Sequence, residues 1–202
     1  MEQRESQQEV WDNIAEEWHK FKKSQGRGVE EFLKSKKGKI LDLGSGSGRN
    51  FIKNDDLEWY LIDFSEKMLD LAEKKAKKLK IKINTFQSDL TKLLFKDNFF
   101  DSAICIAAIH CIKPKYQKKV VKEIYRVLKP KTEALIAVWN KKSKRFKNYK
   151  KKEKYVGWTD KGLRYYYLFE EKEIYNLFEK CGFRIKKKIE SDVNIVFVAG
   201  KP

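Results

Sequence analysis

The sequence is short of cysteine, of acidic residues relative to basic ones, and of long apolar runs. Its three cysteines, Cys105, Cys111 and Cys181, form no C-x-x-C pair and are odd in number, which argues against a disulfide framework and an internal zinc site. No apolar run approaches the roughly 20 residues of a membrane span, and the charged residues 1–5 lack the apolar core of a signal peptide. We therefore expect no membrane segment, no metal site and a cytoplasmic location.

Basic residues strongly outnumber acidic ones. The 202 residues include 46 Lys and Arg against 29 Asp and Glu, a formal net charge of +17. Because Lys and Arg side chains release counterions when they neutralise phosphates, this excess favours a polyanionic partner, with nucleic acid as the first candidate. Genome composition or thermal adaptation is the alternative, but thermally adapted surfaces are rich in both Lys and Glu. Here the lysines exceed the acids and are clustered.

Length and hydrophobic periodicity favour one α/β domain over residues 1–202. Hydrophobic residues make up 41% of the chain, which excludes a disordered protein. Pro130 is expected to end one helix, and Gly182 to follow another at its C′ position. Besides the first four strands, the expected elements are helices at 6–23, 29–34, 50–53, 115–129 and 170–181 and strands at 134–139, 183–189 and 194–199.

Two of these segments allow two interpretations each. The amphipathic helix at 6–23 either caps a ligand pocket or simply packs against the edge of the sheet. The stretch at 140–156 is a basic insertion with interleaved aromatic residues. It either contacts a nucleic-acid backbone and stacks on exposed bases, or it is a solvated loop.

A glycine-rich loop follows the first strand, which runs from residue 39 and contains Asp42 near its end. Gly44, Gly46 and Gly48 come at every second position, and such a loop lets the backbone approach a nucleotide-like ligand closely. The dinucleotide fingerprint G-x-G-x-x-G would place its third glycine at position 49, where this chain has Arg49. The spacing therefore disfavours NAD.

The ends of the next strands carry residues suited to the rest of a nucleoside ligand. A second strand, at 59–62, ends at Asp63, whose carboxylate can accept hydrogen bonds from both ribose hydroxyls. Ser65 is a suitable N-cap for the helix that follows. A third strand, at 81–86, precedes Ser88, Asp89 and Leu90, and residues 100–107 are expected to form a fourth strand and its exit loop.

The D-x-G-x-G-x-G loop resembles motif I of the class I S-adenosylmethionine (AdoMet) methyltransferases. This resemblance implies AdoMet as cofactor and a Rossmann-like, mostly parallel seven-stranded sheet with an antiparallel C-terminal hairpin. In this family the acid faces the methionine moiety, the glycines pass beneath the ligand, and an acid after the third strand accepts from the adenine amino group. The implied cofactor contacts are Asp42, Gly44, Ser45, Gly46, Gly48, Asp63, Phe64, Ser88, Asp89, Leu90, Ile106 and Ala107.

Two further patterns are similar to the tRNA wobble-uridine carboxymethyl methyltransferases, which include the methyltransferase domain of the AlkB-related tRNA-modifying enzyme. The exit of the fourth strand usually reads I-A-x-x-H-H in that family, and here His110 is followed by Cys111. The late motif usually reads R-Y-Y-H-L-F, and this chain has Tyr167 at the position of the histidine. The resemblance implies methylation of the carboxylate of 5-carboxymethyluridine in tRNA, and the two departures lie on the expected substrate side.

The implied reaction needs few catalytic groups. A carboxylate with a pKa near 4 is ionised at neutral pH, so no general base is required, and positioning carries most of the rate. Arg164 is the first candidate to orient the carboxylate and Arg49 the second, while His110 and Tyr166 would bind the uracil edge or the ribose. Alternatively, His110 is a structural hydrogen-bonding residue, Arg164 lies on the surface, and the tyrosines at 165–167 alternate between core and pocket.

Two other function classes remain open at this level. A small-molecule methyltransferase would need a closed apolar pocket, whereas a tRNA enzyme needs an open, positive rim, which the net charge of +17 favours. A non-catalytic tRNA-binding subunit with the same fold is the second alternative, and the intact acids and glycines argue against it. In eukaryotes the tRNA family works with a small zinc-containing activator subunit, so the resemblance implies a similar partner.

Overall fold

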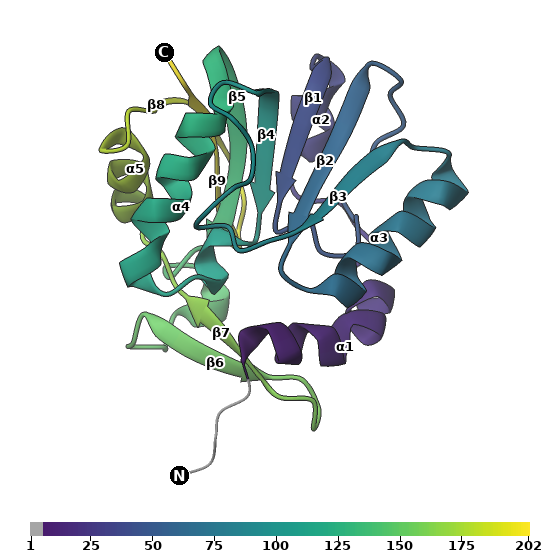
Figure 1. The fold of residues 1–202 in the computed structure, drawn as a ribbon. Helices are drawn as coiled ribbons and strands as arrows, with labels where there is room; N and C mark the ends of the chain where they lie inside the picture. Colours follow the sequence, from purple (N-terminus) through teal and green to yellow (C-terminus); the bar gives the residue numbers. More distant parts are fainter. Residues whose placement is uncertain (1–5) are drawn as a thin grey trace.

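The computed structural model describes residues 6–202, and its centre is a seven-stranded sheet (Figure 1). The strands lie in the order β3-β2-β1-β4-β5-β9-β8, and only β9 runs antiparallel to its neighbours. This confirms the mostly parallel sheet with its C-terminal hairpin. The strands are β1 (Gly38–Leu43), β2 (Leu57–Asp63), β3 (Ile83–Gln87), β4 (Phe100–Ile106), β5 (Leu128–Trp139), β8 (Arg184–Ile189) and β9 (Asn194–Gly200).

Helices cover both faces of the sheet because its strands are apolar on both sides. Successive residues of β1 enter different clusters, with Leu41 facing one core and Ile40 the other. Buried side chains of α4 (Pro114–Val127) and α5 (Glu171–Glu179) complete the first core. Those of α2 (Val29–Lys34) and α3 (Glu66–Leu79) complete the second. The result is a three-layer α/β/α arrangement, as the alternating pattern predicts.

Below the carboxyl ends of the strands, α1 (Gln7–Phe21) lies beside a hairpin formed by β6 (Glu153–Gly157) and β7 (Leu163–Tyr167) (Figure 1). Ser6 caps α1, since its hydroxyl accepts a hydrogen bond from the Glu9 backbone. Side chains of α1 also bind the hairpin: Gln7 donates to the Leu163 carbonyl at 2.9 Å and accepts from the Tyr165 amide at 2.7 Å. The helix expected at 6–23 is therefore present and covers the strand ends.

Four sequence expectations need correction. Residues 50–53 form turns and irregular backbone rather than a helix, because the Asn50 side chain accepts from the Gly26 amide and donates toward Asp42. The helix ends at Val127, and Pro130 lies inside β5 instead of stopping a helix. Proline is tolerated there because the ladder with β4 skips from Leu128 to Glu133.

The third correction concerns the segment at 153–167, which forms a hairpin with no counterpart in the sequence-based prediction. Tyr165, Tyr166 and Tyr167 are all buried, so they do not alternate between core and pocket. Tyr165 and Tyr167 belong to the main core, whereas Tyr166 stacks on Trp139 with ring centroids 4.0 Å apart. Both sides of β7 are therefore covered. At α5 the cap residue is Lys180, so Gly182, with φ of +99°, lies one residue beyond the expected C′ position.

Candidate cofactor and acceptor site

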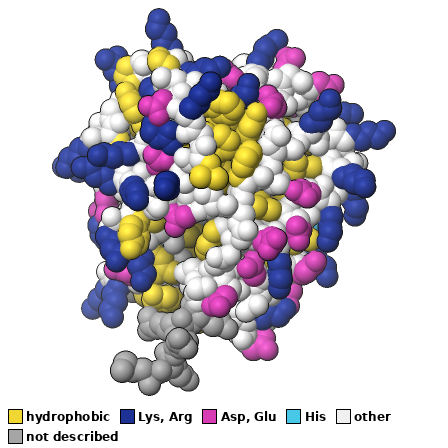
Figure 2. Space-filling view, in the orientation of Figure 1, with side chains coloured by type: hydrophobic (Ala, Val, Ile, Leu, Met, Phe, Trp, Pro, Cys, Tyr) yellow, Lys and Arg dark blue, Asp and Glu magenta, His cyan; other side chains and the backbone are white. Residues whose placement is uncertain are grey.

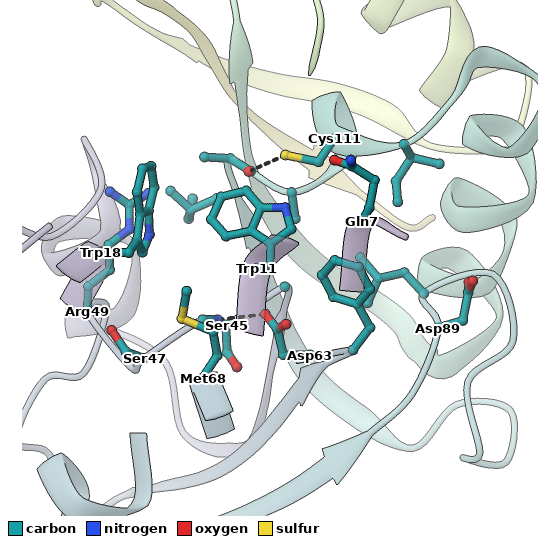
Figure 3. Close-up of a pocket in the computed structure, with 18 of the residues that line it drawn as sticks. Gln7, Trp11, Trp18, Ser45, Ser47, Arg49, Asp63, Met68, Asp89 and Cys111 are labelled. Atoms are coloured by element: carbon teal, nitrogen blue, oxygen red, sulfur yellow. Dashed lines mark hydrogen bonds between the residues drawn. The ribbon is translucent and has the colours of Figure 1, made fainter. Parts of the chain in front are cut away.

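A pocket with a cavity volume of about 260 Å³ lies between the carboxyl ends of the central strands and α1 (Figure 3). Its walls come from the glycine loop, the ends of β2 and β4, the segment after β3, and one side of α1. Ten of the predicted site residues line it: Gly44, Ser45, Gly46, Arg49, Asp63, Phe64, Asp89, Leu90, Ile106 and Ala107. The strand ends therefore bring together residues that the sequence spreads over 64 positions.

The three loop glycines have different roles. All have positive φ, which is costly for residues with a Cβ. A Cβ on Gly44 would lie 2.3 Å from the Ala108 side chain, and one on Gly48 2.4 Å from the Phe51 ring, so these two glycines serve packing. A Cβ on Gly46 would meet nothing closer than Met68 at 4.0 Å. Gly46 is therefore the position where the open space above the loop admits a ligand.

Asp63 is held in place by backbone amides at the end of β2. One carboxylate oxygen accepts from the Gly46 amide at 2.8 Å (Figure 3), and the other accepts from the Ser65 amide at 3.0 Å. Burial raises the pKa of Asp63 to about 6, against the lowering effect of these backbone bonds. Because a carboxylate oxygen has two lone pairs, each can still accept one hydroxyl. Asp63 is thus suited to a ribose diol.

The segment after β3 forms one end of the pocket. Asp89 and Leu90 line it, and the Asp89 carboxylate accepts from the Thr91 amide at 2.6 Å. Ser88 does not line it, because its hydroxyl is directed to the carbonyls of Asp89 and Lys92. Ala107, which follows β4, also lines the pocket. Its φ of +64° is a strained conformation for a residue other than glycine.

Asp42 lies beneath the loop rather than on the pocket surface, which corrects its expected contact with the methionine moiety. The side chain is fully buried, one oxygen has no hydrogen-bond partner, and the other accepts from Asn50 at 3.4 Å. Burial raises the pKa of Asp42 to about 7. Gly48 does not line the pocket either. Both residues support the loop from below.

The residues of this pocket fit AdoMet. Asp63 offers acceptors for the ribose, and Gly46 leaves room above the loop. Ser45 also lines the cavity, and its hydroxyl is buried without a hydrogen-bond partner. Trp11 and Met68 add apolar surface around this polar strip, as is usual for a small-molecule site.

Four cations converge on the other end of the pocket, and we call Lys22, Arg49, Arg145 and Arg164 the cation group. Lys22 and Arg49 line the pocket. Burial lowers the pKa of Lys22, and the three guanidinium groups lower it further. None of the four forms an ion pair with an acid in the part of the chain that the structure describes. An anionic ligand would relieve this unbalanced charge.

Three predicted acceptor-side residues lie behind the pocket wall instead of on its surface, and this corrects their expected direct roles. His110 is 1% exposed, and its Nδ1 accepts from the Trp139 amide at 3.1 Å. Burial lowers its pKa to about 3, so the ring is neutral and structural. Tyr166 is buried against it, and its hydroxyl accepts from Arg164 at 2.9 Å.

Arg164 is enclosed by aromatic rings, with its guanidinium carbon 5.0 Å from the ring centroids of both Trp18 and Trp158. It is 5% exposed, so it is not the surface residue of the alternative interpretation. Its Nη2 donates to the Gly157 carbonyl at 3.3 Å, while Nε is buried and has no partner. Arg164 therefore does not line the pocket, and its positive charge lies behind the rings of α1.

Sequence reasoning allowed the helix at 6–23 to cap the pocket and put Cys111 on the substrate side, but it named no residue of α1 as a contact. Trp11, Trp18 and Lys22 line the pocket, and their spacing of seven and four places them on one helix face, a signal that was available. Cys111 also lines it, with burial raising the pKa of its thiol to about 12. Within residues 6–202, no cluster of potential metal ligands occurs, and no helix is long and apolar enough to cross a membrane. Residues 1–5, on which the signal-peptide expectation rests, lie outside the described part.

Comparisons with known proteins relate this chain to methyltransferases. Residues 40–131 match the family model described as a methyltransferase domain. An Arabidopsis thaliana tRNA (carboxymethyluridine(34)-5-O)-methyltransferase is 29% identical over 133 residues, which cover 64% of this chain and 31% of that protein. A Bos taurus protein named probable tRNA methyltransferase 9B is 27% identical over 134 residues, covering 65% and 28%. The match thus spans about a third of the length of these relatives.

A crystal structure of a SAM-dependent methyltransferase from Methanosarcina mazei superposes with a TM-score of 0.72 at 21% identity, covering 88% of this chain and 98% of that one. At this identity the likeness shows the fold alone. The strand order, the glycine loop, the buried Asp63 and the matched family model all agree. Residues 40–131 therefore match a methyltransferase domain, and the chain as a whole has the fold of the SAM-dependent methyltransferases.

Proposed function

We propose that this methyltransferase acts on tRNA and methylates the carboxylate of 5-carboxymethyluridine at the wobble position. The observation that carries the proposal is the cation group, which gathers four positive charges without an acidic partner beside the cofactor pocket. An acceptor that is itself an anion matches this charge. The relatives named as tRNA methyltransferases support the substrate class.

The proposed reaction needs few catalytic groups from the protein. AdoMet supplies an electrophilic methyl group on a sulfonium; the new bond joins that carbon to a carboxylate oxygen as the C–S bond breaks, leaving S-adenosylhomocysteine and a neutral methyl ester. No proton moves, so the lack of a general base is consistent with the reaction. Neutral His110 behind the wall and the protonated thiol of Cys111 fit this requirement, because neither has to ionise.

Within the cation group, we assign contact with the acceptor carboxylate to Lys22. It lines the pocket, and it is close enough to the three guanidinium groups for their charges to lower its pKa. Arg145 and Arg164 add positive potential from the hairpin side. Arg145 is anchored over the Trp139 ring at 4.6 Å. The lowered pKa of Lys22 reflects the cost of holding its charge among the guanidinium groups, and a bound acceptor anion would reduce that cost. The acceptor is then bound most strongly at the carboxylate, which is the group that reacts.

The basic insertion offers a surface for the tRNA backbone. Its short 3-10 helix, Lys144–Phe146, is held to the body through buried Phe146. The neighbouring lysines have no ion pair with described residues, and six of them lie within eleven positions: Lys141, Lys142, Lys144, Lys147, Lys150 and Lys151. Figure 2 shows Lys and Arg side chains around the periphery of the face that it presents. Such unpaired cations neutralise phosphates and release counterions.

The test is methyl transfer from isotope-labelled AdoMet to tRNA that lacks wobble methyl esters, followed by nucleoside mass spectrometry, with and without a small zinc-containing activator subunit. We expect the methyl ester of 5-carboxymethyluridine to form. Asp63→Ala should abolish it, because two charge-assisted hydrogen bonds to the ribose, each about 1.5–3 kcal/mol, are lost. AdoMet binding without tRNA labelling under either condition would overturn the tRNA assignment and favour a small-molecule acceptor.

A further inference from the structure

Arg49 is a cation of the pocket that the acceptor does not need. It comes directly after the glycine loop, lines the cavity and is half-buried. Its guanidinium has no hydrogen bond or ion pair with any residue that the structure describes. Burial lowers its pKa, and the charge of Asp42 beneath the loop partly opposes this effect. A guanidinium in this position has five donors available for an anion.

The direction of the cofactor determines which anion reaches Arg49. Asp89, after β3, is expected to receive the base and Asp63 the ribose, and in Figure 3 Asp89 lies at the right of the pocket and Asp63 near its centre. Ser47, Arg49 and Trp18 lie together at its other side in the same view. The amino-acid part of the cofactor must therefore run over Gly46, where the cavity is open, toward the end of the loop.

We propose that Arg49 binds the α-carboxylate of the methionine moiety of AdoMet and of S-adenosylhomocysteine. Arg49 is thus a cofactor-binding residue and not the second candidate for the acceptor carboxylate. Asp42 does not occupy Arg49: no hydrogen bond joins the two side chains, so the donors of Arg49 stay free for the ligand. The cation group is divided accordingly, with Arg49 serving the cofactor and the other three serving the acceptor. The proposal does not depend on what the acceptor is.

Calorimetric binding of two probes tests the assignment. S-adenosylhomocysteine carries the carboxylate, whereas 5′-methylthioadenosine has the same adenosine and sulfur but no amino-acid part. We expect Arg49→Met to weaken S-adenosylhomocysteine about ten- to a hundredfold, the value of a hydrogen bond to a charged group. Binding of 5′-methylthioadenosine should change less than about twofold by the same reasoning, because that probe never contacts Arg49. Arg49→Lys should recover part of the loss.

The matched control is Lys53→Met, which removes one positive charge from an exposed position four residues along and outside the pocket. It should leave both affinities unchanged. Equal weakening of both probes by Arg49→Met would show that Arg49 only supports the loop, and an unchanged affinity for S-adenosylhomocysteine would show that the carboxylate binds elsewhere. Either result overturns the proposal. Since neither probe involves tRNA, failure of the tRNA assignment would leave these affinities as they are.

Discussion

The two ends of the pocket are built by different means. At the cofactor end, backbone geometry does most of the work: glycines with positive φ, Ala107 at +64°, and Asp63 clamped by the amides of Gly46 and Ser65. At the acceptor end, long side chains do it, with Arg164 packed among rings of α1 and of the hairpin segment. The acceptor end can therefore change its chemistry by side-chain substitution while the cofactor end stays intact.

The largest expected effect that separates the two ends comes from Arg164→Met. Methionine keeps apolar contact with the Trp18 and Trp158 rings but removes the charge, so kcat/KM for tRNA should fall about ten- to a hundredfold. Affinity for S-adenosylhomocysteine should stay within about twofold, because Arg164 does not line the pocket. Paired steady-state kinetics and calorimetry measure both. An equal loss of cofactor affinity would contradict the division between the two ends.

A second comparison uses the two buried groups whose ionisation is suppressed, Asp42 and His110. Folded Asp42 keeps its proton up to about pH 7, while an unfolded Asp loses it near its ordinary pKa of about 3.9. Its contribution to stability is therefore full below about pH 4 and falls as pH rises toward 7. Between about pH 5 and pH 8, the wild type should lose about 2–3 kcal/mol more unfolding free energy than Asp42→Asn.

His110 has the opposite sign. Its folded pKa is about 3, and an unfolded His binds a proton below about 6.5, so its contribution to stability rises as pH climbs through this interval. Urea denaturation of the wild type, Asp42→Asn and His110→Gln at matched pH values separates the two terms. Parallel pH profiles for all three proteins would show that neither burial effect acts on stability.

The smallest expected effect concerns the basic insertion. Replacing Lys147, Lys150 and Lys151 by alanine should weaken tRNA binding about three- to tenfold and reduce the slope of log affinity against log salt by about two to three, because three phosphate contacts are lost. The control removes the same charge from the exposed face of α3, at Lys74, Lys77 and Lys78. Fluorescence anisotropy over a salt series measures both. Equal losses in the two triple variants would mean that only net charge matters.

The sequence predicts the cofactor end of the pocket better than the acceptor end. The cofactor end could be predicted because its parts are local: a glycine loop after β1, Asp63 at the end of β2 and Asp89 after β3, each recognisable within a few residues. Asp42, Gly48 and Ser88 were the exceptions, and Asp42 is buried beneath the loop in a way that spacing does not reveal.

The acceptor end could not be predicted in the same way because its parts come from distant segments. Arg164 contacts Trp18 only when the hairpin folds against α1, and no local sequence pattern predicts this contact. His110 looked like a ligand-binding residue from its place after β4. Its ring nitrogen instead satisfies the Trp139 amide, an interaction between two strands that the motif does not contain.

The contacts between α1 and the hairpin have a consequence for the roof of the pocket. Besides the two bonds of Gln7, the Glu17 carboxylate accepts from the Trp158 indole at 2.6 Å and from Lys161 at 2.5 Å. These hydrogen bonds contribute roughly 0.5–1.5 kcal/mol each, and the packing of the Trp18 and Phe21 rings on Trp158 adds to them. The roof of the pocket is thus built jointly by the beginning and the last third of the chain.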